Sequence, residues 1–206
     1  MKNVLMAVQP KWLAKILNGE KTVEIRKTIP ECLKNGEPIT VWLYCTKKQH
    51  TELVFRKGED SGYGFNYDKT IFVKMPEAYW SLPLGYHGKV VAKCVVEKYD
   101  YIENEPSYEE DYLKHNLDKT ACMTSDEYYA YATWAKDGHV YALHLTALTV
   151  FDKPMELRQF KSVAFLNRPF KLSTLKDGET ISKSKWEEMA RITRSPQSWM
   201  YVEVGE

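Results

Sequence analysis

The sequence predicts an α+β fold organised around a small β-barrel of about five to six strands with flanking helices. Several strand-like runs lie along the chain, and helices separate them at irregular spacing, so repeated βαβ units are not indicated. The period of the apolar residues also changes from that of a helix to that of a strand at Gly19. The 206 residues suffice for one sizeable core, and no Pro/Gly/Ser-rich linker divides them, so we expect a single domain.

The first expected elements are a strand at residues 4–8 and a short helix at residues 10–18. Pro10 suits the first helical turn, because its missing N–H would be unpaired there in any case. Gly19 suits the position just past the helix end, where a left-handed conformation is favourable only without a Cβ atom. Between these two residues the apolar side chains recur at a spacing of four and form one stripe.

A strand is expected at residues 22–26, directly after the glycine. Alternate side chains of a strand point to opposite faces, so the two apolar residues share one face while Thr22, Glu24 and Arg26 share the other. Neighbours on one face lie roughly 6.6 Å apart along the strand. Glu24 and Arg26 can therefore act together on a common partner.

Further elements follow along the chain. Two S/T-x-x-E motifs, Ser107 to Glu110 and Thr124 to Glu127, match the capping box with which many helices begin. A charged helix is expected at residues 183–191. Two of the remaining strands are long enough to bend around a small barrel. The remaining expected strands are residues 39–45, 89–101, 139–151 and 199–203.

The pattern Gly19-x-Lys21-x-x-Glu24-x-Arg26 after a Pro-led helix resembles the G-x-K-x-x-E-x-R signature of the ASCH domain, a relative of the PUA-like RNA-binding folds. Three later segments are similar to successive ASCH blocks, in family order. The resemblance implies a PUA-like pseudo-barrel spanning residues 1–206, and an RNA-linked role. It leaves out residues of about 47–87 and 103–137, which we interpret as elaborated insertions. The three similar segments are residues 88–96, 140–157 and 192–202.

Composition limits the classes of ligand. The net charge is only +1, so nucleic-acid binding must depend on a local patch rather than on a generally basic surface. Fourteen tyrosines and six tryptophans fit a β-rich core and also offer surfaces on which bases stack. The four cysteines form no CxxC pair, and the histidines are far apart in sequence, so we expect no metal and no cofactor.

The chain contains no N-terminal apolar segment before a cleavage site and no apolar run of membrane-spanning length. We therefore expect a soluble cytoplasmic protein without a membrane partner. The aromatic-rich stretch within residues 47–87 has two interpretations. It is either a lid that stacks on a base or, as we prefer, a variable loop packed by its own aromatic side chains.

The candidate site centres on the signature residues. Lys21 offers a compact positive charge beside a flexible turn, Glu24 accepts hydrogen bonds from a base amino group, and Arg26 positions Glu24 or contacts phosphate. The alternative is a structural Glu24–Arg26 pair with Lys21 in solvent. A second group near the C-terminus adds positive charge and amide and hydroxyl donors. The expected ligand-contacting residues are Gly19, Lys21, Thr22, Glu24, Arg26, Arg194, Ser195 and Gln197.

The leading functional hypothesis is a binding module for RNA or a modified nucleotide. A hydrolase acting on RNA or a modified nucleoside is the first alternative, with Lys21 and Glu24 as its catalytic residues. The resemblance to ASCH amidohydrolases is partial, because those proteins have a threonine nucleophile where this chain has Glu24. A protein-interaction adaptor is the second alternative. No P-loop, nucleophile elbow or dinucleotide glycine motif is present.

Overall fold

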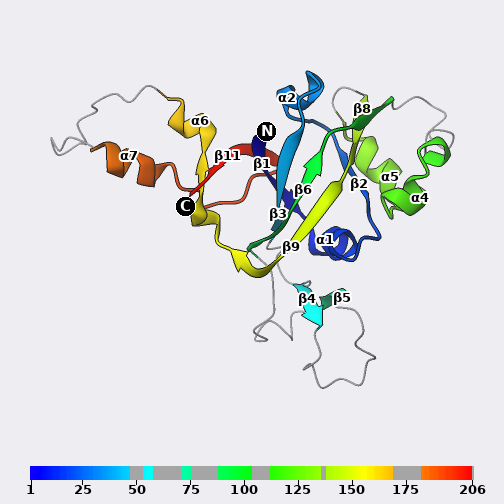
Figure 1. Cartoon of the computed structure of the whole chain (residues 1–206). Helices are drawn as coiled ribbons and strands as arrows, with labels where there is room; N and C mark the ends of the chain where they lie inside the picture. Colours follow the sequence, from blue (N-terminus) through cyan, green and yellow to red (C-terminus); the bar gives the residue numbers. More distant parts are fainter. Residues whose placement is uncertain are drawn as a thin grey trace.

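The chain forms an α+β structure, as the sequence predicts, in a computed structural model (Figure 1). The strands in the described part of the chain form one six-stranded sheet, one three-stranded sheet and one separate hairpin. Among the described residues no helix is long and apolar enough to span a membrane. The structure describes residues 1–46, 88–103, 112–135, 138–168 and 182–205, together with the backbone of residues 53–57 and 71–75.

The six-stranded sheet is mixed. Its strands are β1 (Lys2–Val8), β3 (Ile39–Cys45), β6 (Val90–Val96), β9 (Thr146–Met155), β10 (Phe160–Ser162) and β11 (Trp199–Val204). They lie in the order β10-β11-β1-β3-β6-β9. The pair of β1 and β3 is parallel and every other pair is antiparallel. Both edges of β1 are therefore hydrogen bonded to neighbouring strands.

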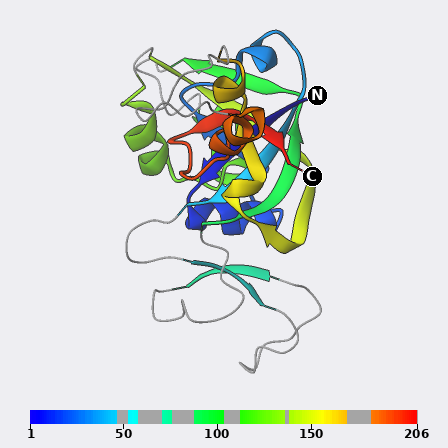
Figure 2. The ribbon, with the colours of Figure 1, turned by 90° about the vertical axis from the view of Figure 1, so that its left-hand side faces the viewer.

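The three-stranded sheet has the order β2-β8-β7. Its strands are β2 (Val23–Arg26), β7 (Tyr99–Glu103) and β8 (His139–His144), and both of its pairs are antiparallel. The separate hairpin pairs β4 (Leu53–Lys57) with β5 (Ile71–Met75). Figure 2 shows this hairpin extending away from the rest of the chain, on the side of the helix that begins at Pro10.

Short helices cover the two ends of the sheets. Helices α4 and α5 lie beside the three-stranded sheet, whereas α6 and α7 lie at the opposite end of the molecule (Figure 1). The Thr124 capping box is confirmed, because its hydroxyl accepts from the Glu127 backbone N–H and the Glu127 carboxylate accepts from the Thr124 N–H. The helices are α1 (Pro10–Leu17), α2 (Glu31–Lys34), α4 (Leu117–Thr120), α5 (Ser125–Ala132), η2 (Leu157–Gln159), α6 (Val163–Leu166) and α7 (Lys183–Met189).

Each of the two long predicted strands is divided in the structure. Residues 89–101 contain β6 and the start of β7, and residues 139–151 contain β8 and the start of β9. The pairing continues across both breaks: Val95 lies opposite Thr146 before the bend, and Tyr99 lies opposite Leu143 after it. One antiparallel hairpin thus bends from the six-stranded sheet into the three-stranded sheet. The sequence predicts two continuous long strands, whereas the structure divides each of them at this bend.

The prediction of a closed barrel is wrong for the described part of the chain, because neither sheet closes on itself. Strand β2 is an edge strand of the three-stranded sheet. It approaches β1, but β1 already has backbone partners on both edges. The connection is made by a side chain instead. The Arg26 Nη2 donates to the Ala7 carbonyl at 2.6 Å.

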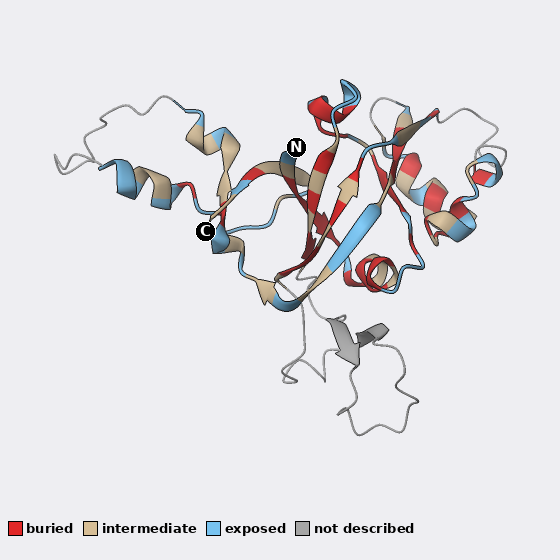
Figure 3. Ribbon diagram, in the orientation of Figure 1, coloured by how far each residue is buried: buried red, intermediate tan, exposed pale blue. Residues whose placement is uncertain are grey.

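Strand β1 lies at the centre of the core. Val4, Met6 and Val8 pack on one of its faces, together with the apolar stripe of α1. Leu5 and Ala7 pack on its other face, in a separate cluster of buried side chains. Figure 3 shows this concentration of buried residues along β1, β3 and the inner side of α1. The two faces of β1 thus hold together the cores on both sides of the large sheet.

The predicted Ser107–Glu110 capping box and the aromatic-rich stretch at residues 61–67 and 76–86 lie outside the described residues. The two interpretations of that stretch remain predictions. So does the single-domain organisation with insertions at about 47–87 and 103–137.

Replacing a core leucine tests the central position of β3. Leu43 is fully buried in the main cluster. Leu43→Ala is therefore expected to lower the free energy of unfolding by about 2–5 kcal/mol, because it removes buried apolar surface and leaves a cavity. Leu113, which is 63% exposed, supplies the control. Urea unfolding that shows equal losses for Leu43→Ala and Leu113→Ala would contradict this assignment of the core.

Candidate ligand-binding site

The turn between α1 and β2 places Lys21. Gly19 adopts a positive φ of 75°, which a residue with a Cβ rarely adopts, as the sequence predicts for a helix end. The Lys15 carbonyl then accepts from the backbone N–H groups of both Glu20 and Lys21, at 2.9 and 3.1 Å. These bonds direct the chain into β2 with the Lys21 side chain pointing inward.

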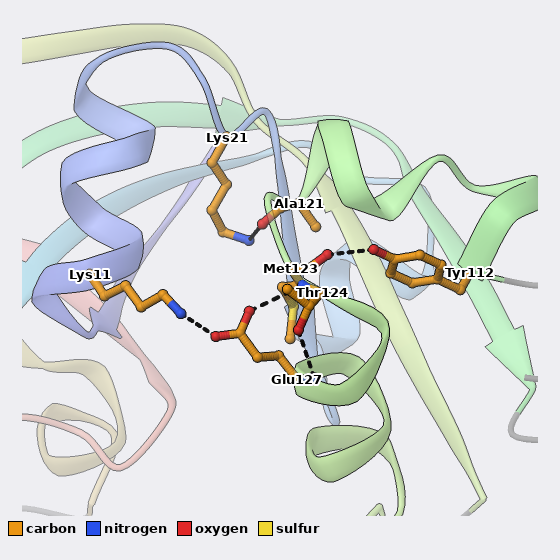
Figure 4. Close-up of polar contacts among 7 residues, drawn as sticks. All are labelled: Lys11, Lys21, Tyr112, Ala121, Met123, Thr124 and Glu127. Atoms are coloured by element: carbon orange, nitrogen blue, oxygen red, sulfur yellow. Dashed lines mark hydrogen bonds and ion pairs between the residues drawn. The ribbon is translucent and has the colours of Figure 1, made fainter. Parts of the chain in front are cut away.

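Lys21 is buried, with only 2% of its surface exposed. Its Nζ donates to the Ala121 carbonyl at 2.8 Å (Figure 4) and lies 3.3 Å from Glu24 Oε2. It also lies 5.2 Å from the centre of the Trp12 ring. The alternative in which Lys21 is solvated is therefore wrong.

Glu24 and Arg26 lie on one face of β2, as strand alternation predicts. Glu24 Oε1 and Arg26 Nη2 form an ion pair at 2.9 Å. Arg26 also contacts the C-terminal segment, because its Nη1 lies 3.5 Å from the Ser198 Oγ. Both side chains are buried. The carboxylate of Glu24 thus holds a cation on each oxygen, Lys21 on one and Arg26 on the other.

Electrostatics in this cluster favour an additional acceptor. Two cationic side chains surround one carboxylate, so the cluster is net positive while Lys21 is protonated. Burial lowers the pKa of Lys21, and the nearby Glu24 opposes that shift. A buried positive charge with incomplete neutralisation is stabilised by a further negative or acceptor group.

A cavity of about 540 Å³ opens beside the cluster. Two of its polar atoms, Arg26 Nε and Thr46 Oγ1, are buried and lack a hydrogen-bond partner in the described part of the chain. Such buried groups without a partner are uncommon in folded proteins. The cavity is lined by Ala7, Gln9, Trp12, Lys21, Glu24, Ile25, Arg26, Lys27, Thr28, Thr46, Met123, Tyr131, Gln197 and Ser198.

The segment that leads into α5 supports one wall of the cavity (Figure 4). Glu127, within the capping box, forms an ion pair with Lys11 of α1, and the hydrogen bond from Lys11 lowers the pKa of Glu127. The Tyr112 hydroxyl donates to the Met123 carbonyl at 2.7 Å. These contacts hold the backbone that presents Ala121 to Lys21 and Met123 to the cavity.

The protein has a second cavity of about 850 Å³, and the predicted site residues are divided between the two cavities. Lys21, Glu24, Arg26 and Gln197 line the first cavity, and Arg194 and Ser195 line the second. Gly19 and Thr22 line neither cavity. Gly19 forms the turn with its positive φ, and the Thr22 backbone pairs with Thr120 and Leu145. The second cavity is lined by Tyr44, Thr46, Gly88, Glu156, Leu157, Arg158, Gln159, Arg191, Ile192, Thr193, Arg194 and Ser195.

Sequence reasoning missed the aromatic walls of the first cavity. Trp12 belongs to the apolar stripe of α1 and packs against the core, but it is only partly buried and also lines the cavity. Tyr131 lies in α5, in the region that the resemblance does not cover, and burial raises its pKa. The Thr124 capping box was the available signal that a helix begins there. Within the described residues no group of His, Cys, Asp and Glu side chains is arranged to hold a metal ion.

The sequence matches no protein-family model and no curated protein. Its fold, however, is similar to solved ASCH structures. The ASCH protein of Zymomonas mobilis is 14% identical, with a TM-score of 0.50 over 98% of this chain and 88% of that one. Serine-to-alanine and tyrosine-to-phenylalanine mutants of the same protein are each 13% identical, with TM-scores of 0.52 and 0.51. These two matches cover 98% of this chain and 89% and 91% of the mutants.

These similarities confirm the ASCH-like fold expected from the sequence. At this level of identity they concern the arrangement of helices and strands. The chemistry of the cavity therefore has to be argued from the residues of this chain.

The lowered pKa of Lys21 predicts a particular pH dependence of stability. Between that lowered value and the ordinary value of 10.5, the unfolded chain binds a proton that the folded protein lacks, so stability rises with pH in this window. Below both values the folded protein carries the full cost of burying the ammonium group. Lys21→Met removes the titrating group, so the wild type should gain stability relative to this variant as pH increases toward 10.5.

Urea unfolding of both proteins between about pH 7 and pH 10.5 measures the difference, and comparison with the variant cancels the titration of other groups. Lys34→Met is the control, because the side chain of Lys34 is 42% exposed and its ammonium pairs at the surface with Glu31. Parallel stability profiles for the wild type and Lys21→Met would show that Lys21 is not desolvated.

Proposed function

We propose that this ASCH-like domain binds RNA, or a modified nucleotide, through the cavity beside Lys21, Glu24 and Arg26. The observation that carries the proposal is a buried, net positive cluster at the wall of a cavity with aromatic sides. The ASCH-like fold supports the same class of ligand, because the resemblance to the PUA-like families implies RNA binding. We further propose that the bent sheets correspond to a PUA-like pseudo-barrel that is open on one side.

The size and chemistry of the cavity suit one nucleotide. Small-molecule sites commonly enclose about 300–1,000 Å³ and combine apolar walls with a few polar groups, and this cavity measures about 540 Å³. Trp12 and Tyr131 contribute aromatic surface, on which any base can stack. The cavity therefore combines an aromatic surface, on which a planar ring can stack, with the charged side chains of Lys21, Glu24 and Arg26 in the same lining.

The polar groups match the edge of a base or a phosphate. Arg26 Nε and the Thr46 hydroxyl are unpaired donors, suited to a carbonyl or phosphate oxygen. Each oxygen of Glu24 contacts one cation and keeps further acceptor capacity for an exocyclic amino group. The presence of a carboxylate acceptor together with these donors favours a nucleotide over a simple anion, because a carboxylate would repel an anion.

A purely structural role explains the cluster less well. Buried ion pairs contribute little net stability compared with apolar residues of similar size, because desolvation offsets the attraction between the charges. A cluster that served only to connect β2 with β1 would not need an adjoining cavity or unpaired donors. Ligand binding accounts for both features.

The hydrolase alternative also has one observation in its favour. The lowered pKa of Lys21 makes the neutral amine more accessible, as a base or nucleophile requires. Each oxygen of Glu24, in contrast, already forms an ion pair, one with the Lys21 Nζ and the other with the Arg26 Nη2. Nothing at the site favours the adaptor alternative, because Lys21 is buried at a cavity wall and does not face bulk water.

Replacing Lys21 tests the binding proposal. Lys21→Met is expected to weaken the binding of single-stranded RNA or a 5′-ribonucleotide by about 1–3 kcal/mol, which is about 5- to 150-fold, because a charge-assisted contact is lost. Gln197→Ala, at an exposed position of the same cavity, should weaken binding by up to about 10-fold without affecting the core. Fluorescence anisotropy and calorimetry measure both affinities.

Lys34→Ala is the matched control, since Lys34 lies on α2 in a surface pair with Glu31. Its affinity should equal that of the wild type. If Lys21→Met and Gln197→Ala both bind RNA and nucleotides as the wild type does, the cavity is not the binding site.

Turnover separates binding from catalysis. We expect the wild type to release no product from single-stranded RNA or acetylated cytidine, because the ion pairs of Glu24 leave the site without a free carboxylate base. Chromatography of the incubated substrates measures this directly. Hydrolysis by the wild type that falls by roughly 100-fold or more in Glu24→Gln, with affinity retained, would replace the binding proposal by the hydrolase alternative.

A further inference from the structure

The second cavity adds a separate set of positive charges beside the first. We propose that it binds the phosphate backbone of the same RNA strand whose base enters the first cavity, so that the preferred ligand is single-stranded RNA and not a free nucleoside or nucleotide. This inference rests on the proposed function and specifies its ligand.

The charges of the second cavity favour a polyanion. Three of its lining residues are arginines, Arg158, Arg191 and Arg194, and none of them forms an ion pair with a described carboxylate. Glu156 is the one acidic residue in the lining, and Lys89 neutralises it in an ion pair. The protein as a whole carries a net charge of only +1, so this concentration of arginines without a described carboxylate partner is a local feature.

Backbone hydrogen bonds hold two of these arginines on ordered elements. Arg191 forms a bridge to Lys161 of β10, and the adjacent Ile192 donates its N–H to the Phe160 carbonyl at 2.8 Å. The Arg191 Nη1 donates to the Arg158 carbonyl at 2.8 Å, which joins the segment after α7 to η2. The arginines are thus positioned by the sheet edge and not by a loose tail.

Thr46 connects the two cavities. It lines both of them, and its buried hydroxyl has no partner in the part of the chain that the structure describes. A ligand that passes from one cavity to the other would therefore pass Thr46.

The C-terminal segment also follows both cavities. Arg194 and Ser195 line the second cavity, whereas Gln197 and Ser198 line the first. Three residues span at most about 10 Å when extended, and stacked nucleotides of one strand advance about 3.4 Å each. The two cavities are therefore close enough for neighbouring nucleotides of a single strand.

Hydroxyl and amide groups complete the second lining. Thr193, Ser195 and Gln159 supply neutral donors among the arginines. Alternation of cationic and neutral donors is typical of surfaces that contact a sugar–phosphate backbone. An acidic protein segment would match the arginines, but it would not use the aromatic cavity on the other side of Thr46.

Arg194→Ala tests the proposal, because Arg194 is exposed and its loss should leave the fold intact. The probes are a 5′-ribonucleotide mixture and a mixed-sequence single-stranded RNA of about 12 nucleotides. The wild type should bind the RNA more tightly than the nucleotides. Arg194→Ala should weaken RNA binding about 5-fold or more, reduce the dependence of log K on log[salt] by about 1, and leave nucleotide affinity unchanged.

Arg158→Ala should act in the same way, and Arg168→Ala is the control. Arg168 is exposed and contacts the Phe165 ring, outside both cavities. If Arg194→Ala and Arg158→Ala bind RNA like the wild type while Lys21→Met does not, the second cavity does not contact the strand and the proposed function stands.

Two other outcomes overturn the inference in different ways. Equal loss of nucleotide and RNA affinity in Arg194→Ala would mean that both cavities hold a single nucleotide. If neither RNA nor nucleotides bind the wild type, the proposed function itself fails. Binding of an acidic peptide that depends on Arg194 but not on Lys21 would then assign the second cavity to a protein partner.

Discussion

The ion pairs of Glu24 are the interaction on which the site depends. This carboxylate contacts Lys21 with one oxygen and Arg26 with the other, and each cation in turn binds a main-chain carbonyl. The carbonyls belong to Ala121, before α5, and Ala7, in β1. Three side chains from one short segment thereby connect the α5 region, the three-stranded sheet and the six-stranded sheet. The cavity lies where these three parts meet.

Local rules explain why part of this arrangement could be predicted. The helix end at Gly19 and the alternation of β2 depend on neighbouring residues, so the sequence places Glu24 and Arg26 on one face. The bend between β6 and β7 could not be predicted in the same way, because the apolar pattern continues through it. The contact of Lys21 with Ala121 joins residues far apart in the chain, and no local pattern encodes it.

The same distinction applies to the second group of site residues. Arg194 and Gln197 are close in sequence and were expected to serve one site, yet they line different cavities, because the segment between them passes from one to the other. In the sequence Trp12 and Tyr131 look like ordinary core residues. Both pack against the same buried cluster, which includes Tyr128 and Ala132 of α5, and this tertiary packing brings them to the cavity wall. The fold is similar to ASCH structures at only 13–14% identity, so the same arrangement of strands tolerates wide changes in the side chains that line a cavity.

The side-chain connection between β2 and β1 has a geometric consequence. Strands that pair through their backbones lie about 4.8 Å apart, and at that separation no ligand fits between them. Here both edges of β1 are occupied by other strands, and β2 is held to it through the length of an arginine side chain. If β2 paired with β1 through the backbone, the closed sheet would gain interstrand hydrogen bonds, but the cavity between the two strands would be lost. The open seam therefore allows the protein to keep its two sheets attached while leaving a cavity of about 540 Å³ beside the connection.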